Sequence, residues 1–342
     1  MPFIDRLLDI KSLSIVGTAK NTGKTATLNY ILRRLPKVVP DYTLGLTSIG
    51  LEGERRDQVT QTDKPEITLG KETLFVTAER YYLQKQLSAE VIGIERTFTT
   101  STGRLIYAKA KGKGKVLIAG PPTTQGLRKA VEVMERHGAD FVVIDGALSR
   151  RSLASPAVAE GLVLATGAAF SAQPEQLIYK TRDIVRQIAL PALPDTDLAL
   201  RLEQVERGIR LVDDKEVIDP GYASALLPHF WQDPRWRGYN GWLYVSGAVH
   251  DQLLEKVRLT KGWQGVIVRD FTRLFVSGQV LGRFIESGKE VYCLRRARLM
   301  AVTFNPLAPS GYKMDSAEMC GRLTDALGVP VYDIMKTDEA IS

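Results

Sequence analysis

The chain has 342 residues, of which 44% are hydrophobic and 25% charged, and this length predicts roughly two domains of about 150 residues or one large α/β unit. Such a composition excludes a disordered, collagen-like or coiled-coil protein, and no apolar run approaches the roughly 18 to 20 residues of a membrane-spanning helix. The net charge of +7 favours anionic partners in general, but over this length it is too dilute to identify one.

The predicted elements begin with an apolar run at 12–18, a short polar loop, and a segment in which Leu28, Ile31 and Leu35 have helical spacing. Two further strands, 104–110 and 115–120, are joined by the turn-like sequence KGKG, which predicts a hairpin. The alternation of strands with helices predicts a mostly parallel, doubly wound α/β sheet. The other elements predicted before residue 219 are strands at 43–48, 73–78, 141–145 and 162–167, and helices at 124–138 and near 173–189. After residue 241 the alternation of strands and helices resumes, with strands at 242–247 and 265–270.

A segment rich in proline, glycine and aromatic residues, 219–240, interrupts this alternation and is predicted to be a linker. We therefore expect a nucleotide-binding domain over 1–218 and a smaller C-terminal α/β layer over 241–342. The aromatic residues in and beside the linker form either an interface or ligand wall, or, more commonly, an anchor to the core. They are Phe230, Trp231, Trp236, Tyr239 and Trp242.

The most informative motif is GTAKNTGKT at 17–25, which follows the first strand and opens the first long helix. The phosphate-loop consensus is G-x4-G-K-[ST]; its first glycine falls on Thr18 here, and Gly17, one position earlier, can still supply the turn. In such a loop Lys24 would reach the β and γ phosphates, and the Thr25 hydroxyl would ligate Mg²⁺. The alternative is a chance GKT in a helix N-terminal turn. The candidate nucleotide-binding residues are Gly17, Thr18, Lys20, Asn21, Thr22, Gly23, Lys24, Thr25 and Ala26, and among them Lys20 is equally well explained as a solvated side chain.

A second acidic group is needed near such a loop to hold Mg²⁺, and Asp145 ends the apolar strand FVVID. Because this strand is expected to end at the same sheet edge as the loop, Asp145 is the predicted metal-linked carboxylate; a strand-terminal capping role is the alternative. Ser149 and Arg150 follow it and are candidate contacts on the phosphate side.

The charged loop at 47–57 lies where a switch segment would sense the γ-phosphate. Asp57 is the candidate for a second metal-linked carboxylate or for a group that orients water, and with Lys24 it makes up the predicted catalytic pair. An ordinary solvated loop explains the same residues equally well.

Other kinds of site have little support in the sequence. Cys293 and Cys320 have no partner at metal-ligand spacing and no nearby histidine, so zinc or iron sites and glutamine amidotransferase chemistry are disfavoured. No stacking motif for RNA is present, and residues 1–18 do not resemble a secretory signal. We expect a cytoplasmic protein without nucleic-acid or membrane partners.

The variant GT-x4-GKT resembles the loop of dethiobiotin synthetase and of the amidases that act on cobyrinic acid. Over nearly its full length, the chain resembles the P-loop subunit of the reactivating factor for adenosylcobalamin-dependent lysine 5,6-aminomutase. The resemblance implies a chaperone-like subunit that uses ATP and Mg²⁺, with a companion ATPase subunit and the aminomutase as partners. It is carried by the stretches SLSIVGTAKNTGKTATLNY, LGLTSIG, FVVIDGALSRRSLASPAV, ATGAAFS, GVIVRDFTRLFVS, AVTFNPLAPSGY and GVPVYDIM.

Three functions remain open at this stage. The first is a Mg²⁺-ATP-binding reactivase subunit with slow, partner-stimulated hydrolysis. The second is a stand-alone ligase of the dethiobiotin synthetase type that phosphorylates a carboxylate. The third is a nucleotide sensor or scaffold that does not hydrolyse ATP. Self-association into a homo-oligomer is compatible with each of them.

Overall fold

The chain folds into two compact units, and one of them is built from two separated parts of the sequence. The computed structural model describes residues 3–49, 67–96, 99–100, 102–147, 155–213 and 216–336. The first unit consists of Met1–Ile178 and Leu299–Ser342, and the second of Tyr179–Arg298. Three predicted site residues, Asp57, Ser149 and Arg150, lie outside the described ranges.

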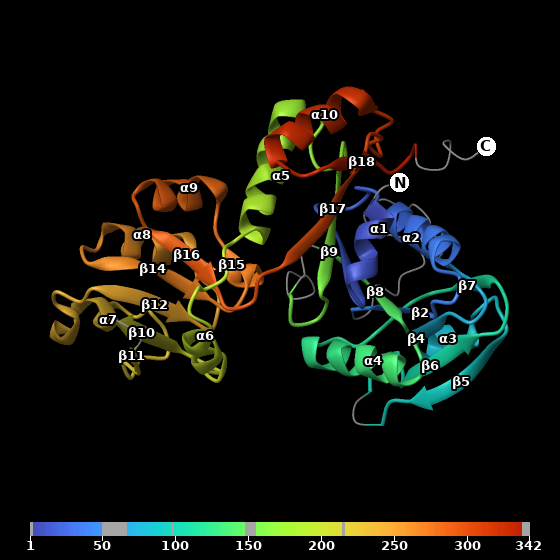
Figure 1. Cartoon of the computed structure of the whole chain (residues 1–342), viewed down its shortest axis with the longest axis horizontal. Helices are drawn as coiled ribbons and strands as arrows, with labels where there is room; N and C mark the ends of the chain where they lie inside the picture. The colour runs from blue at the N-terminus through green and yellow to red at the C-terminus, as the bar shows by residue number, and fades with distance from the viewer. Residues whose placement is uncertain are drawn as a thin grey trace. The chain divides into compact units, whose positions relative to one another are not determined.

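The first unit contains a large sheet whose central strands are parallel (Figure 1). Among the described residues, nine strands form it in the order β18-β17-β9-β1-β8-β2-β4-β6-β5. Strand β1 runs parallel to β8 and β9, and β2 runs parallel to β8 and β4, whereas β6 is antiparallel to β4 and β5. The predicted α/β class with a mostly parallel sheet is confirmed. The strands are β1 (Ser12–Gly17), β2 (Leu44–Ser48), β4 (Leu74–Ala78), β5 (Ala89–Ile94), β6 (Leu105–Ala110), β8 (Phe141–Ala147), β9 (Gly161–Gly167), β17 (Arg298–Asn305) and β18 (Val331–Asp333).

Alternation along the strands directs side chains to the two faces of this sheet. Phe141 and Val143 of β8 join the core that contains Leu28 and Ile31 of α2, whereas Val142 and Ile144 join the core of α4. Both faces are therefore covered, which explains why the central strands are buried and mostly apolar. The helices of this unit are α1 (Phe3–Arg6), α2 (Lys24–Val38), α3 (Glu79–Leu83), α4 (Thr124–Arg136) and α10 (Ser316–Leu327), and α5 (Pro174–Ile188) contributes residues to both units.

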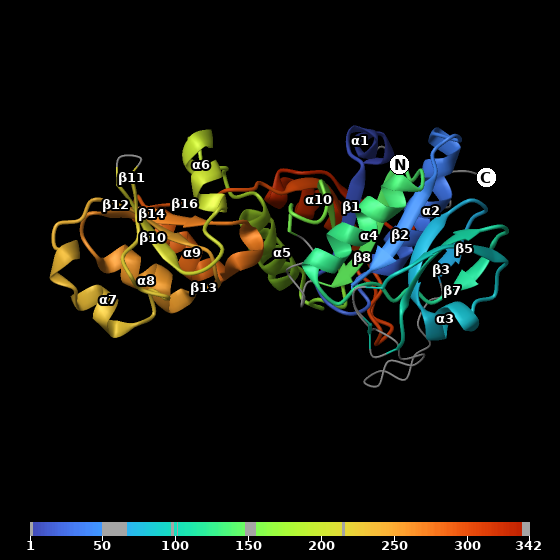
Figure 2. The ribbon, with the colours of Figure 1, turned by 90° about the horizontal axis from the view of Figure 1, so that it is seen from below.

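The second unit has its own sheet, in the order β11-β10-β12-β14-β16. Strands β12, β14 and β16 are parallel, and β10 is antiparallel to β11 and β12. Helix α6 packs on one face, and Figure 2 shows α8 and α9 on the other. The elements are α6 (Thr196–Glu203), β10 (Ile209–Asp213), β11 (Glu216–Ile218), α7 (Pro228–Gln232), β12 (Gly241–Val245), β13 (Val249–His250), α8 (Asp251–Leu259), β14 (Trp263–Val268), β15 (Leu274–Phe275), α9 (Gly278–Glu286) and β16 (Glu290–Cys293).

The division between units differs from the boundaries expected from the sequence. The expected linker at 219–240 lies inside the second unit, and residues 241–298 belong to that unit as well. Strands β17 and β18 extend the first sheet beside β9. The apolar pattern of a buried strand shows that it needs partners on both sides, but it does not specify which sheet supplies them.

The hairpin predicted at 104–120 is wrong. Strand β6 pairs with β4 and β5, and the three-residue strand β7 (Gly114–Val116) pairs instead with β3 (Ile67–Leu69). Strand β5 is not among the elements predicted from the sequence, and its residues, Ala-Glu-Val-Ile-Gly-Ile, are half-buried or exposed. It takes the position beside β6 that the hairpin would have given to 115–120.

The aromatic residues of 219–240 attach this segment to the second unit. The Phe230 ring is fully buried and contacts the rings of Tyr222, Trp231 and Trp263 at centroid distances of 5.5, 5.0 and 5.9 Å. Trp242 packs separately, against Tyr292. The commoner interpretation, an anchor to the core, is the one that the contacts support. No helix in the described ranges is long and apolar enough to cross a membrane.

Candidate functional site

The loop between β1 and α2 leaves the middle of the first sheet. Gly17, the last residue of β1, is in register with Ala147 of β8 on one side and Ala165 of β9 on the other. Beyond the strand, the Thr18 amide donates a 2.9 Å hydrogen bond to the Ala165 carbonyl, and the Thr18 hydroxyl lies 3.4 Å from that of Thr166. The start of the loop is therefore held at the carboxyl edge of the parallel strands, where ligands bind in open α/β sheets.

Two left-handed residues then turn the chain into α2. Asn21 has φ of 62° and Gly23 has φ of 90°, and the Thr22 hydroxyl closes the turn by donating to the Ala19 carbonyl at 2.9 Å. Gly23 is the N-cap of α2 and has no side chain that could cap it, and the first turn contains no acidic residue. The first amides of α2 and the positive end of its dipole thus face the loop with no acidic side chain from that turn, an arrangement that suits a bound anion.

Lys24 and Asp145 meet beside this turn. The Lys24 Nζ lies 3.0 Å from the Asp145 Oδ1, and each side chain is 19% exposed. Asp145 is on the same strand face as Phe141 and Val143, the face covered by α2, because it lies an even number of residues away from both. The strand that carries Asp145 therefore ends at the same sheet edge as the loop, as expected from the sequence.

The Asp145 carboxylate has unused capacity as an acceptor. Its Oδ1 is buried and makes the ionic contact with Lys24, but it has no hydrogen bond of ordinary geometry among the described residues. A buried carboxylate oxygen without a hydrogen bond is costly, and a hard cation or its water shell would satisfy it. These residues therefore fit a Mg²⁺-phosphate group.

Asn305, at the end of β17, is a neighbour of the loop that the sequence did not reveal. Its Nδ2 donates to the Asn21 carbonyl at 2.9 Å, and its own carbonyl accepts from the Ala168 amide at 2.9 Å. Nearby on the same strand, the Thr303 hydroxyl lies 2.8 Å from the Thr27 hydroxyl of α2. The stretch AVTFNPLAPSGY, which contains Asn305, contributes to the resemblance, but nothing in it shows that this strand lies near 17–25.

Gly120 is a second residue at this edge that the sequence did not identify. The Ser48 hydroxyl, at the end of β2, donates to the Ile118 carbonyl at 3.1 Å and accepts from the Gly120 amide at 3.2 Å. A Cβ at 120 would overlap the Ser48 carbonyl, so only glycine allows this close approach. Residues 118–120 therefore lie beside the end of β2, whose Ser48 is in register with Asp145 on the neighbouring strand β8.

The other predicted loop residues differ in exposure. Thr18 and Thr22 are buried and structural, Lys20 and Asn21 are exposed, and the first-turn residues Thr25 and Ala26 are half-buried. No group of three or more acidic, histidine or cysteine side chains that could hold a metal occurs within the described ranges. Any metal here would therefore need oxygen ligands from the phosphates or water in addition to Asp145 and Thr25.

The cysteines are unsuited to covalent catalysis. Burial raises the pKa of the Cys293 thiol to about 12 and that of Cys320 to about 11. A thiol acts as a nucleophile only as the thiolate, which is scarce near neutral pH at these values. The geometry thus agrees with the expectation that amide transfer from glutamine is disfavoured.

Comparison with known proteins adds no family to this description. No family model matches the chain, and no curated protein matches it at a significant level.

Proposed function

We propose that this chain is the P-loop, Mg²⁺-ATP-binding subunit of a cytoplasmic reactivating factor for an adenosylcobalamin-dependent aminomutase. The observation that carries the nucleotide part is the contact between Lys24 and Asp145 beside the uncapped start of α2. A phosphate-binding lysine and a metal-linked carboxylate are the two charged groups that such a site requires.

In this proposal the main-chain amides of 18–25 bind the phosphate oxygens, and Lys24 exchanges its contact with Asp145 for the β and γ phosphates. Asp145 and the Thr25 hydroxyl would hold Mg²⁺, directly or through water. When bound, the ion would supply positive charge that offsets the charge of the phosphates. Asp57 keeps its proposed role of orienting water, and Ser149 and Arg150 remain candidate phosphate-side contacts.

The contact between Asn305 and the loop offers a route from nucleotide to protein partner. Asn305 begins the stretch NPLAPSGY, which closes into a turn through hydrogen bonds between Ala308 and Tyr312 (2.8 Å) and between Met314 and Pro306 (3.0 Å). A change in the loop at Asn21 therefore reaches this turn through one hydrogen bond. Ordering of a loop by nucleotide typically couples two sites by about 1–3 kcal/mol, enough to shift a partner between two conformations.

The reactivase part rests on the resemblance of the chain's motifs, two of which contain Asp145 and Asn305. A companion ATPase subunit and the aminomutase are the partners it implies. The raised pKa values of the two thiols count against glutamine amidotransferase chemistry, the activity of the amidases with a similar loop.

Nucleotide binding is tested by isothermal titration of the full chain with ATP. We expect Lys24→Ala to weaken binding about ten- to a hundred-fold, because a charge-assisted contact is lost, and the exposed Lys37→Ala control to leave it unchanged. Asp145→Asn should weaken binding in the presence of Mg²⁺ and not in EDTA. Absence of binding at millimolar ATP, or an unaltered Lys24→Ala variant, would refute the nucleotide part.

The reactivase part needs a second assay, with inactivated lysine 5,6-aminomutase and the companion subunit. We expect slow ATP hydrolysis by the chain alone, faster hydrolysis in the mixture, and recovered aminomutase activity that Lys24→Ala abolishes. Intact ATP binding without recovery would refute this part alone. Rapid ADP release with a small carboxylic acid would instead favour the ligase, and no phosphate release under any condition would favour the sensor.

A further inference from the structure

The second unit contains a cavity that the proposed nucleotide site does not include. Its volume is about 340 Å³, near the lower end of the roughly 300–1,000 Å³ typical of small-molecule sites. It lies where the carboxyl ends of β12 and β14 meet the start of β10, since Ile209 of β10 is in register with Val245 of β12. Crevices at the carboxyl ends of parallel strands are the usual ligand sites of such sheets.

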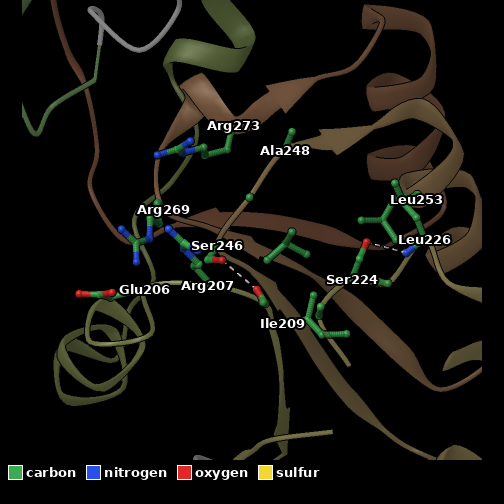
Figure 3. Close-up of a pocket in the computed structure, with 15 residues that line it drawn as sticks. Glu206, Arg207, Ile209, Ser224, Leu226, Ser246, Ala248, Leu253, Arg269 and Arg273 are labelled. Carbon is green, nitrogen blue, oxygen red and sulfur yellow. Dashed lines mark hydrogen bonds between the residues drawn. The ribbon is translucent and has the colours of Figure 1, made fainter. Parts of the chain in front are cut away.

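One end of the cavity is cationic. Arg207, Arg269 and Arg273 line it together with a single acidic residue, Glu206, and Figure 3 shows Arg207 and Arg269 beside Ser246. The Arg269 Nε donates to the Tyr244 hydroxyl at 3.3 Å, and its Nη2 donates to the Val205 carbonyl at 2.5 Å. These bonds orient the guanidinium and use two of its N–H groups, so its planar fork is held in place before any ligand arrives.

The opposite end is apolar. Figure 3 shows Leu226, Leu253 and Ile209 there, on the far side of Ser246 from the arginines. Ile209 and Leu253 are 1% and 3% exposed, so this wall belongs to the packed core, while Leu226 is 52% exposed and borders the opening. A ligand that fills the cavity would therefore place an anionic group and an apolar body at opposite ends.

We propose that this cavity binds a small organic anion, a carboxylate or phosphate attached to a compact apolar group. Arginine is suited to these anions because its fork matches two oxygens at once, and the apolar wall would add affinity that a bare inorganic anion lacks. This site is independent of the nucleotide loop, since every lining residue belongs to the second unit.

The test is isothermal titration of the full chain with phenyl phosphate and with benzoate, which share a ring and differ in the anion. We expect saturable binding of at least one of them, and weaker binding of phenol and of inorganic phosphate. Arg273→Gln should weaken binding about ten-fold or more, because Arg273 is exposed and its loss removes a charged contact without disturbing the core. The matched control Arg237→Gln, at an exposed arginine of the same unit outside the cavity, should bind as the unchanged chain does.

Two further variants keep the result decisive. Ala248 is exposed and lines the cavity, so Ala248→Leu should narrow it and weaken binding without affecting folding. Lys24→Ala should leave binding unchanged. No saturable binding of either probe at millimolar concentration would overturn the proposal, as would binding that survives both Arg273→Gln and Ala248→Leu. Binding lost only in Lys24→Ala would assign the anion to the nucleotide loop and equally overturn it.

Discussion

The two units place their candidate anion sites at the same topological position and build them by different means. In the first unit, the left-handed residues Asn21 and Gly23 turn the chain so that the first amides of α2 face the loop, and Lys24 lies beside this turn. In the second unit, side chains from separated segments surround a cavity, and arginines supply the charge. A site made by the main chain within nine consecutive residues leaves a local motif in the sequence, whereas a site assembled from side chains far apart in the sequence does not.

The helices beside the two sites show a related difference. Helices α4, α6, α9 and α10 each begin with a side-chain cap, from Thr123, Asp195, Ser277 and Asp315. Helices α2 and α8 begin without one. However, α8 carries Asp251 in its first turn. The Asp251 Oδ1 accepts a 2.8 Å hydrogen bond from the Ser277 amide. The start of α8 therefore already carries an acidic side chain, and the positive charge that lines the cavity comes from arginine side chains.

The largest effect that we expect concerns thiol chemistry, which neither site should use. At about pH 9, an ordinary thiol is roughly half ionised, whereas a pKa of about 11 at Cys320 or about 12 at Cys293 leaves about a hundredth or less as thiolate. Alkylation of the native chain by iodoacetamide should therefore be about fifty-fold or more slower than that of the denatured chain, and should accelerate as pH rises.

Mass spectrometry of the digested protein measures the two cysteines separately. Cys320 should react before Cys293, which is only 2% exposed. Rapid labelling of Cys293 near neutral pH would show that the second unit contains a reactive nucleophile. This result would contradict the expectation that neither site uses thiol chemistry.

A smaller effect is expected from Gly23→Val, which tests whether the first site depends on its main chain. A side chain at φ of 90° is strained, and a Cβ there would lie 3.0 Å from the Asn305 Cβ and 3.1 Å from the Ile334 Cγ2. We expect the free energy of unfolding, measured with urea, to fall by about 1–3 kcal/mol, and ATP binding to weaken. Gly112→Val is the control, because a Cβ there meets nothing within 4 Å. Equal stability of the two variants would show that the loop tolerates another main-chain path.

The smallest effect is expected from Asn305→Ala. This change removes two neutral hydrogen bonds, one from the Asn305 Nδ2 to the Asn21 carbonyl and one from the Leu307 amide to the Asn305 Oδ1. Only the first reaches the loop, and such a bond is worth about 0.5–1.5 kcal/mol, so ATP affinity should fall by less than about ten-fold. Binding of phenyl phosphate to the cavity should not change. Asn240→Ala, at an exposed asparagine of the second unit, is the control for ATP titration and should have no effect. Unchanged ATP affinity in Asn305→Ala would show that the contact between β17 and the loop does not affect nucleotide binding.

Part of the first site could be predicted because its rules are short-range. The proximity of Lys24 to Asp145 follows from a loop after one parallel strand, a carboxylate at the end of another, and the alternation of side chains. Asn305 and Gly120 could not be found in the same way. Their closeness to the loop and to β2 depends on the order of strands in the sheet, and that order places β17 two strands away from β1 although they are far apart in sequence.

By itself the sequence determined the α/β class and most strands and helices, because strand alternation and helical spacing act over a few residues. It assigned the turn before α2 to Gly17, whereas Asn21 and Gly23 are the left-handed residues there. Only the tertiary structure decided that β17 and β18 return to the first sheet, that β7 pairs with β3, and that Arg207, Arg269 and Arg273 converge on one cavity. These outcomes depend on which buried surfaces find partners across long stretches of chain, and a local pattern carries no record of that choice.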